Sequence, residues 1–226
     1  MKKAIVIGDI HGGLKALTNL IKKIDPEKND QLIFLGDYVD GWSESAKTVD
    51  YLIELDKKYN CIFIKGNHDS WCQHWLNGET ANDTWVRRGG RLTIESYQKL
   101  SAEAKESHRI FFNRLRYFYV DKHNRLFIHA GFSSMHGPQN EMYASNYSWD
   151  RTLWETALAT DKNIKKHSAL YPKRLLLYKE IFIGHTPTTN YDILGRLYFN
   201  PLYTRRPRLN CPSNWLRHVP RIRYFA

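Results

Sequence analysis

The chain has 226 residues, 42% of them hydrophobic, which is enough to bury a sizeable core in one compact domain. Its net charge is +11, but seven Arg in residues 194–226 supply +7 of it, so the rest of the chain is only mildly basic. No apolar run is long enough for a signal peptide or a membrane span, and three Cys without metal-binding spacing fit a reducing compartment, so we expect a cytoplasmic protein with no membrane partner.

The first 65 residues alternate between short apolar runs and helical patterns. Residues Ala4–Ile7, 32–35 and 62–64 are apolar and rich in β-branched or aromatic side chains, which is typical of buried strands. Between them, leucines and isoleucines recur at helical spacing over Leu14–Ile24, and a second helical pattern covers about 43–58. Strands that alternate with helices predict a parallel α/β unit.

The second half of the chain has a less regular pattern. Residues 71–115 are rich in Trp and helical periods, and we interpret them as a helical insertion. Residues 117–120 and 126–128 flank a polar turn and predict a hairpin, while residues 181–183 predict a further strand. Residues 133–178 are polar and helical in character.

Five short polar segments come directly after the predicted strands. They combine Gly with Asp, His or Asn and occupy residues 8–12, 36–40, 66–69, 129–131 and 184–186. Side chains of Asp, His and Asn bind divalent ions, and Gly lets the backbone bend sharply and approach a bound group. Because several strand ends meet at one edge of an open α/β sheet, the segments predict one shared polar site.

Each of these segments also has a simpler interpretation. An Asp after a strand is commonly a helix N-cap, and Asp69 could cap the helix that follows it. A single His such as His11 is commonly a structural polar contact, and Asn67 could serve a tight turn. These interpretations do not explain why all five segments lie at strand ends, so a shared site is favoured.

The five segments, in this order, resemble the calcineurin-like metallophosphoesterases, and more narrowly the bacterial type of the phosphoprotein phosphatase (serine/threonine phosphatase) branch. The resemblance runs from Ala4 to about Asp192. It implies an α/β fold, specifically a four-layer α-β-β-α metallophosphoesterase sandwich with a helical insertion near the active site.

The resemblance also implies roles for eight polar residues. Six of them would hold two divalent metal ions: Asp9, His11, Asp37, Asn67, His129 and His185. Of these, Asp37 would bridge the two ions. Mn is the expected metal, with Fe or Zn as alternatives, because carboxylates and imidazoles suit these ions. A metal-bridging hydroxide would be the nucleophile, His68 would protonate the leaving oxygen, and Asp40 would orient His68.

Two departures from the family pattern concern phosphate binding. Gly41 and Trp42 replace an expected Arg-Gly pair, and Lys65 stands where the family tends to carry Arg, which grips phosphate with two hydrogen bonds. Arg151 occupies a place where the family often keeps another phosphate-binding Arg, so Arg151 and Lys65 are the candidate phosphate clamp. The alternative for Arg151 is an ordinary surface Arg paired with a neighbouring acid.

Residues 194–226 depart furthest from the family. Relatives usually complete the second sheet here with an Asp-Thr-Gly segment, whereas this segment offers Arg, Pro and aromatic residues without acids. We therefore predict a metallophosphoesterase domain over residues 1–193 and an atypical, poorly packed basic tail over 194–226. A tail that binds anionic polymers is the alternative.

Together, the residues and the resemblance predict a dinuclear-metal-dependent phosphoric ester hydrolase, specifically a phosphomonoesterase that acts on phosphoserine or phosphothreonine. The expected partner is a phosphorylated protein or a small phosphoester. Symmetrical hydrolysis of diadenosine tetraphosphate stays open as an alternative, with Trp42 able to stack on a base. A nucleic-acid-binding protein that uses the basic tail is a further alternative, which the complete set of site residues disfavours.

Overall fold

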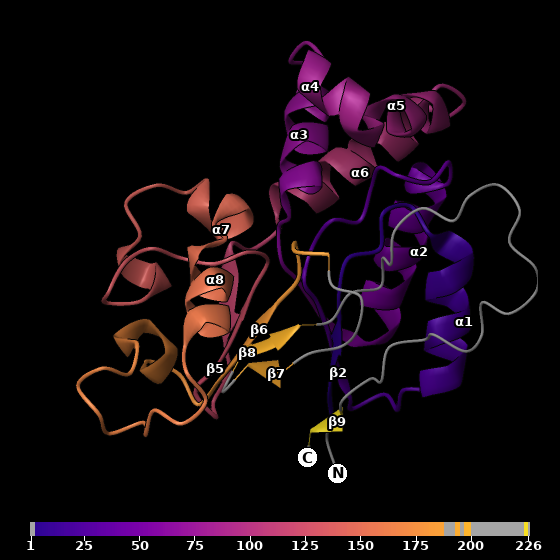
Figure 1. Ribbon diagram of the computed structural model, residues 1–226. Helices are drawn as coiled ribbons and strands as arrows, with labels where there is room; N and C mark the ends of the chain where they lie inside the picture. The colour runs from indigo at the N-terminus through magenta and orange to yellow at the C-terminus, as the bar shows by residue number, and fades with distance from the viewer. Residues whose placement is uncertain (1–2, 188–192, 195–196, 200–223, 226) are drawn as a thin grey trace, which may run out of the picture.

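The computed structural model describes residues 3–187, 193–194, 197–199 and 224–225, which form two small β-sheets with helices on their outer sides (Figure 1). The first sheet has the strand order β3-β2-β1-β9. Its members are β1 (Ala4–Ile7), β2 (Gln31–Phe34), β3 (Asn60–Phe63) and β9 (Tyr224–Phe225). Strands β1, β2 and β3 are parallel and are connected by α1 (Leu14–Ile24) and α2 (Ser45–Lys58), so the predicted parallel unit is confirmed.

The second sheet has the strand order β4-β5-β6-β8-β7. Its members are β4 (Phe118–Val120), β5 (Arg125–Ile128), β6 (Glu180–Ile183), β7 (Ile193–Leu194) and β8 (Leu197–Phe199). Strands β4 and β5 form the predicted antiparallel hairpin. Strand β5 is parallel to β6, so their carboxyl ends lie at the same edge of this sheet.

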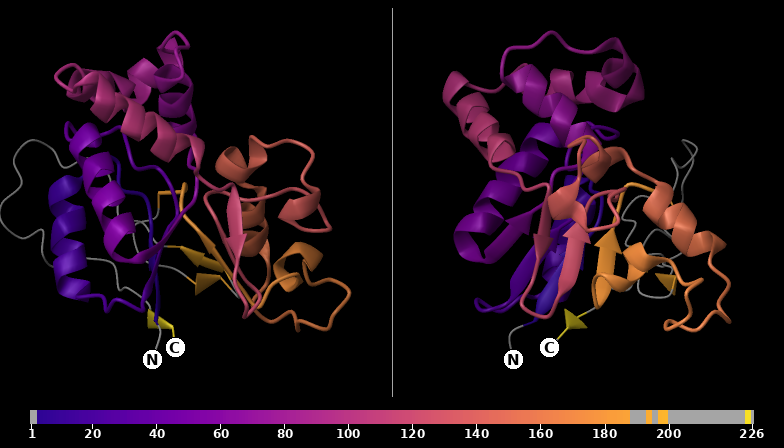
Figure 2. Two further views of the ribbon diagram at one scale, coloured as in Figure 1. Left: turned by 180° about the vertical axis from the view of Figure 1, so that it is seen from behind. Right: turned by 90° about the vertical axis from the view of Figure 1, so that its left-hand side faces the viewer.

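Three hydrophobic clusters show how these layers pack. Successive side chains of β1 point to opposite faces: Ile5 and Ile7 join a cluster with α1 and α2, whereas Ala4 and Val6 join one with the second sheet. A third cluster joins the other face of the second sheet, including Ile181, to the helices that cover it. Helices, sheet, sheet and helices therefore follow one another through the molecule (Figure 2).

A group of helices lies beyond the carboxyl ends of the first sheet's parallel strands (Figures 1 and 2). Its members are α3 (Asn67–Leu76), α4 (Asp83–Trp85), the π-helical turn η1 (Val86–Gly90), α5 (Arg91–Tyr97) and α6 (Ala102–Asn113). The insertion predicted for 71–115 is helical as expected but begins earlier, because Asn67 opens α3 almost directly after β3.

The long connection between β5 and β6 carries short helices that cover the second sheet. They are η2 (Pro138–Asn140), α7 (Asn146–Trp149), α8 (Thr152–Ala159) and η3 (Lys173–Leu176). In the part of the chain that the structure describes, no helix combines the length and apolarity needed to cross a membrane.

The predicted domain boundary at residue 193 falls inside β7. Strand β8, beyond that boundary, pairs with β6, and β9 pairs antiparallel with β1, so both sheets include backbone from the segment predicted as a tail. Residues 195–196 and 200–223 lie outside the described residues. The poor packing and the polymer binding predicted for this segment therefore stay predictions.

Candidate metal centre

The polar segments of the sequence lie at the carboxyl ends of five parallel strands. Asp9 and His11 follow β1, Asp37 and Asp40 follow β2, Asn67 and His68 open α3 after β3, His129 follows β5, and His185 follows β6. Three of these strands belong to the first sheet and two to the second, and the inner faces of the sheets pack on each other. One site is therefore built from both sheets, as polar residues at strand ends predict.

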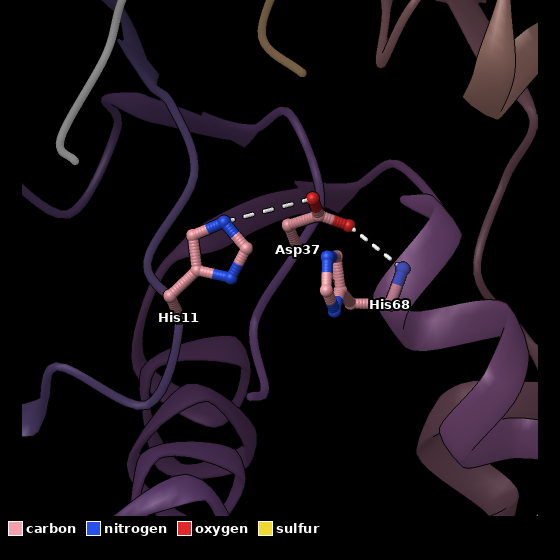
Figure 3. A group of neighbouring side chains, drawn as sticks. All are labelled: His11, Asp37 and His68. Carbon is pink, nitrogen blue, oxygen red and sulfur yellow. Dashed lines mark hydrogen bonds and ion pairs between the residues drawn. The ribbon is translucent and has the colours of Figure 1, made fainter. Parts of the chain in front are cut away.

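Asp37 lies between the contributions of the two sheets. Its Oδ2 atom is 3.7 Å from Nε2 of His11 and 3.4 Å from Nε2 of His129. Its Oδ1 atom accepts a 3.0 Å hydrogen bond from the backbone N–H of His68 (Figure 3). Asp37 belongs to two groups of side chains whose ligand atoms are close enough together to hold a metal ion. One group is Asp37 with His11 and His68, and the other is Asp37 with His129 and His185.

Asn67 lies against the second of these groups. The Oδ1 atom of Asn67 lies 3.2 Å from Nε2 of His129 and 2.9 Å from Nδ1 of His185. The other ring nitrogen of His129, Nδ1, hydrogen-bonds to the carbonyl of Leu35 at 2.8 Å. This bond fixes the ring so that Nε2 faces Asn67 and Asp37, which is how proteins orient an imidazole toward a metal ion.

Asp9 and His11 are the contributions of the segment after β1. The carboxylate of Asp9 accepts a 3.0 Å hydrogen bond from the backbone N–H of His185, which ties the end of β1 to the end of β6. His11 holds its Nδ1 atom 3.2 Å from the carbonyl of Val39 and turns Nε2 toward Asp37. The structure therefore brings all six predicted metal ligands together, and their individual roles stay predictions.

The pKa shifts of Asp37 and His185 favour the deprotonated forms that bind divalent cations. Burial opposes ionisation of Asp37, but the neighbouring His129 and His68 hold its pKa well below its usual range, so the carboxylate is charged. Burial, reinforced by the charge of His129, lowers the pKa of His185 to about 3, so its imidazole is neutral and keeps a lone pair for a metal. Burial and the charge of Asp37 raise the pKa of Asp9, and bound cations would relieve this repulsion.

His68 borders the same group but is held as a proton donor. Its Nδ1 atom lies 2.5 Å from Oδ2 of Asp40, and the ring of Trp71 packs edge-on against it at 5.3 Å between centroids. Burial lowers the pKa of His68, but the charge of Asp37 and the hydrogen bond with Asp40 outweigh burial and raise the pKa to about 9. Against the effect of burial, Asp37 also raises the pKa of the predicted ligand His129 to about 9, so it is the hydrogen bond with Asp40 that marks His68 as the candidate general acid.

The insertion anchors Asp40 through a set of hydrogen bonds that sequence reasoning missed. Trp85 donates from Nε1 to Oδ2 of Asp40 at 2.7 Å, and Thr93 donates from Oγ1 to Oδ1 at 2.6 Å. The backbone N–H of Asp40 donates to the hydroxyls of Ser45 and Thr93 at 3.1 and 3.0 Å. Gly90 permits this arrangement, because a Cβ there would overlap the indole of Trp85. The spacing of Trp85 and Thr93 in the sequence gives no sign of these contacts.

Asp69 joins two of the polar segments through its carboxylate. It does not cap a helix that begins after it, because it is the third residue of α3, where it accepts the backbone N–H of the N-cap residue Gly66 at 2.8 Å. It also accepts the backbone N–H groups of Asp37 at 2.7 Å and Tyr38 at 2.8 Å. Gly66 is needed for this approach, since a Cβ there would overlap Asp37. Asp69 therefore joins the segment after β3 to the segment after β2 and holds the shared carboxylate in place.

Four of the site residues have left-handed backbone conformations. Their φ angles are +51° at His11, +53° at Asp37, +71° at Asp40 and +63° at His185. A non-glycine residue held in this region costs on the order of 1–3 kcal/mol, and such residues cluster at functional sites, where the surroundings hold them. The hydrogen bonds to Asp69 and Thr93 are surroundings of this kind.

The two candidates for phosphate binding have different surroundings. Arg151 is exposed, and its Nε atom donates to Nε2 of His185 at 3.4 Å, so its guanidinium lies beside the site. Lys65 is buried, and its ammonium donates to Oε1 of Gln73 at 2.7 Å and lies 5.0 Å from the ring centre of Tyr117. Arg151 is placed near a phosphate bound at the site, whereas Lys65 would have to leave these contacts. Both phosphate-binding roles stay predictions.

Comparison of the sequence with known protein families and proteins identifies its relatives. The sequence model described as calcineurin-like phosphoesterase matches residues 2–211, so the chain belongs to this family. Two relatives are named asymmetrical bis(5'-nucleosyl)-tetraphosphatase PrpE. The protein from Oceanobacillus iheyensis is 27% identical over 143 residues, which cover 57% of this chain and 56% of that protein. The protein from Geobacillus sp. (strain WCH70) is 24% identical over 208 residues, which cover 86% of this chain and 82% of that protein.

The chain therefore spans little more than half the length of the Oceanobacillus relative. Solved structures share its fold. A protein serine/threonine phosphatase from Saccharomyces cerevisiae matches with a TM-score of 0.61 and 18% identity, over 88% of this chain and 66% of that one. A cold-active protein-tyrosine phosphatase from a Shewanella species matches with a TM-score of 0.59 and 13% identity, over 88% of this chain and 70% of that one. At such identities the likeness shows the fold alone.

Proposed function

We propose that this calcineurin-like phosphoesterase is a metal-dependent hydrolase that cleaves dinucleoside tetraphosphates. The observation that supports a hydrolase is the position of His68. Asp40 holds His68 beside the carboxylate of Asp37, and Asp37 belongs to both candidate metal-binding groups. A proton donor next to two cation sites can serve the leaving oxygen of a phosphoryl group while positive charge stabilises the remaining oxygens.

The names of the relatives favour a dinucleotide substrate over the phosphoprotein that the sequence analysis put first. Both relatives with that name are called tetraphosphatases of bis(5'-nucleosyl) compounds, and one of them aligns with 86% of this chain. The similarity to a serine/threonine phosphatase concerns the fold alone. The same names say asymmetrical, so we replace the symmetrical cleavage considered from the sequence with cleavage that yields a nucleoside monophosphate and a nucleoside triphosphate.

The first group of site residues would bind the metal ions. Six side chains would hold two divalent ions: Asp9 and His11 on one side, Asn67, His129 and His185 on the other, and Asp37 between them. Ions at these positions supply positive charge that stabilises the oxygens of a phosphoryl group under attack by water.

The other groups act on the leaving side and on the phosphate. Nδ1 of His68 is bonded to Asp40, so Nε2 is the atom that would deliver a proton to the leaving phosphate. Asp40 keeps the ring oriented, and Trp85 and Thr93 keep Asp40 in place. Arg151, exposed beside His185, would bind phosphoryl oxygens through its planar guanidinium.

The products of diadenosine tetraphosphate hydrolysis test the proposal. The chain is incubated with Mn²⁺ and the dinucleotide, and products are separated by ion-exchange chromatography. We expect AMP and ATP in equal amounts, with no reaction in the presence of a chelator and a strongly reduced rate in His68→Asn protein from the same preparation. ADP as the sole product would show symmetrical cleavage. Faster hydrolysis of a phosphoserine peptide, with the dinucleotide left intact, would overturn the proposal.

A further inference from the structure

A groove extends from the metal centre along the first helix of the insertion. It has a volume of about 740 Å³ and begins at Asn67, one of the predicted metal ligands. One wall is the exposed side of α3, and Trp149 at the end of α7 lines it as well. Because Asn67 lines the groove and is a predicted metal ligand, the groove adjoins the predicted metal centre.

Two indoles form an aromatic wall next to the site. The ring centres of Trp71 and Trp149 are 5.0 Å apart, and the rings meet edge to face at 73°. Trp71 contacts the ring of His68, and Trp149 lies 6.0 Å from the ring of His185. Trp149 is 38% exposed, so it has ring surface to offer a ligand in the groove. Together the two indoles extend from the proton donor to a predicted metal ligand.

The charges along the groove indicate where the phosphate and where the base of a ligand would lie. The groove is also lined by Glu79 and Asp83, both exposed, which come from the segment after α3. Glu79 lies 3.5 Å from Nδ1 of His74, which also lines the groove, and Asp83 adds a second carboxylate. Phosphate is therefore favoured less in the groove than at the metal centre, where the predicted ions and Arg151 would lie. Carboxylates accept hydrogen bonds from the amino groups of adenine, cytosine and guanine. A molecule with phosphates at one end and an aromatic base at the other matches this distribution of charge.

We propose that this groove is a nucleobase subsite, in which Trp149, held edge to face by Trp71, stacks on the base of a nucleotide whose phosphate occupies the metal centre. The proposal deepens the proposed function, on which it rests for the phosphate end of the ligand. It assigns base stacking to Trp149, with Trp71 supporting that ring, and not to Trp42, which the sequence had suggested. Trp42 is also exposed, at 41%, but it follows β2 and does not line this groove.

The test compares two ligands that share a phosphate and differ in the base. Calorimetric titrations of the Mn²⁺-loaded chain give the dissociation constants of AMP and of ribose 5-phosphate. We expect AMP to bind roughly 5- to 100-fold more tightly, as base–aromatic stacking provides. In Trp149→Ala this advantage should be lost, and in Trp149→Phe, which keeps a ring in place, it should largely return. Ribose 5-phosphate serves as the internal reference for any change at the metal centre.

Trp42→Ala is the matched control. The groove assignment predicts that this variant keeps the full preference for AMP. Equal binding of AMP and ribose 5-phosphate to the wild-type chain would overturn the proposal, and so would a preference lost in Trp42→Ala but kept in Trp149→Ala. Tighter binding of a basic phosphoserine peptide than of AMP would overturn it in favour of a peptide groove.

The titrations do not require turnover, so their failure is distinct from that of the proposed function. A preference for AMP that depends on Trp149 supports the groove even if the dinucleotide is not cleaved. Cleavage of the dinucleotide without such a preference supports the proposed hydrolase activity and rules out base binding in the groove.

Discussion

The two sheets contribute to the metal centre in different ways. The residues after β2 and β3 are held within the first sheet's half of the molecule: Asp37 by Asp69, and Asp40 by Trp85 and Thr93. On the second sheet, the ring of His129 is bonded to a carbonyl after β2, and the backbone N–H of His185 is bonded to Asp9 after β1. The first sheet's half therefore orients the ligands of the second. A substitution in the first half should weaken metal binding by both halves, whereas a substitution in the second should affect its own ligands alone.

The largest expected effect comes from the carboxylate that both halves share. Asp37→Asn removes the negative charge next to His11 and His129 while the side chain keeps its size. We expect hydrolysis to fall below detection and the content of bound Mn²⁺, measured by mass spectrometry after dialysis, to drop. Near-normal metal content in this variant would show that Asp37 does not link the two groups.

The next effect separates proton donation from metal binding. His68→Asn should keep its bound metal but lose roughly 10²–10⁴ in rate, because a positioned general acid contributes about that much. The loss should be larger for phenyl phosphate than for p-nitrophenyl phosphate, whose leaving group needs less protonation. A variant that hydrolyses both esters at the wild-type rate would remove His68 from the role of acid.

A smaller effect should follow when the insertion releases Asp40. Thr93→Val removes the hydroxyl that donates to Oδ1 of Asp40 and accepts its backbone N–H, so the buried Oδ1 loses this donor while the N–H keeps its bond to Ser45. We expect a loss of about 1–3 kcal/mol in the free energy of unfolding and a loss in kcat of roughly tenfold, measured by urea denaturation and steady-state kinetics. Thr18→Val, at a partly exposed hydroxyl on α1, is the matched control and should change stability by less than about 0.5 kcal/mol. Equal effects of the two substitutions would contradict the anchoring role.

The smallest effect is a pH dependence in the chain without metal. The pKa of His68 is raised to about 9 in the folded chain, so its protonation stabilises the fold. This contribution is complete below pH 6.5, the ordinary value, and is lost as the pH rises through about 9. In a chelating buffer, the difference in melting temperature between wild type and His68→Asn should therefore be larger at pH 6 than at pH 9.5. A difference that is constant across this range would contradict the raised pKa.

Much of this arrangement can be predicted from the sequence, because it depends on local patterns. The runs at Ala4–Ile7 and Leu14–Ile24 are strand and helix as their periodicity predicts. The polar segments after the strands converge because parallel strands end at one edge, which is a general property of such sheets.

The parts that escaped prediction depend on contacts between distant segments. Trp85 and Thr93 reach Asp40 only because the insertion folds back over the end of β2, and nothing in their spacing identifies that carboxylate. Lys65 comes directly before the Gly-Asn-His segment, yet its ammonium is engaged by Gln73 and Tyr117. The pairing of β9 with β1 joins the two ends of the described chain, which no local pattern could indicate.

A metal titration tests the central claim, a two-ion centre that is shared by the two sheets and organised by the first. Mn²⁺ binding is measured by calorimetry for the wild-type chain, for His185→Asn and for Asp9→Asn. We predict two ions for the wild type and one for His185→Asn, whose first half stays intact. Asp9→Asn should lose affinity at both sites, because Asp9 also orients His185. A single ion in the wild type, or the loss of both ions in His185→Asn, would contradict this account.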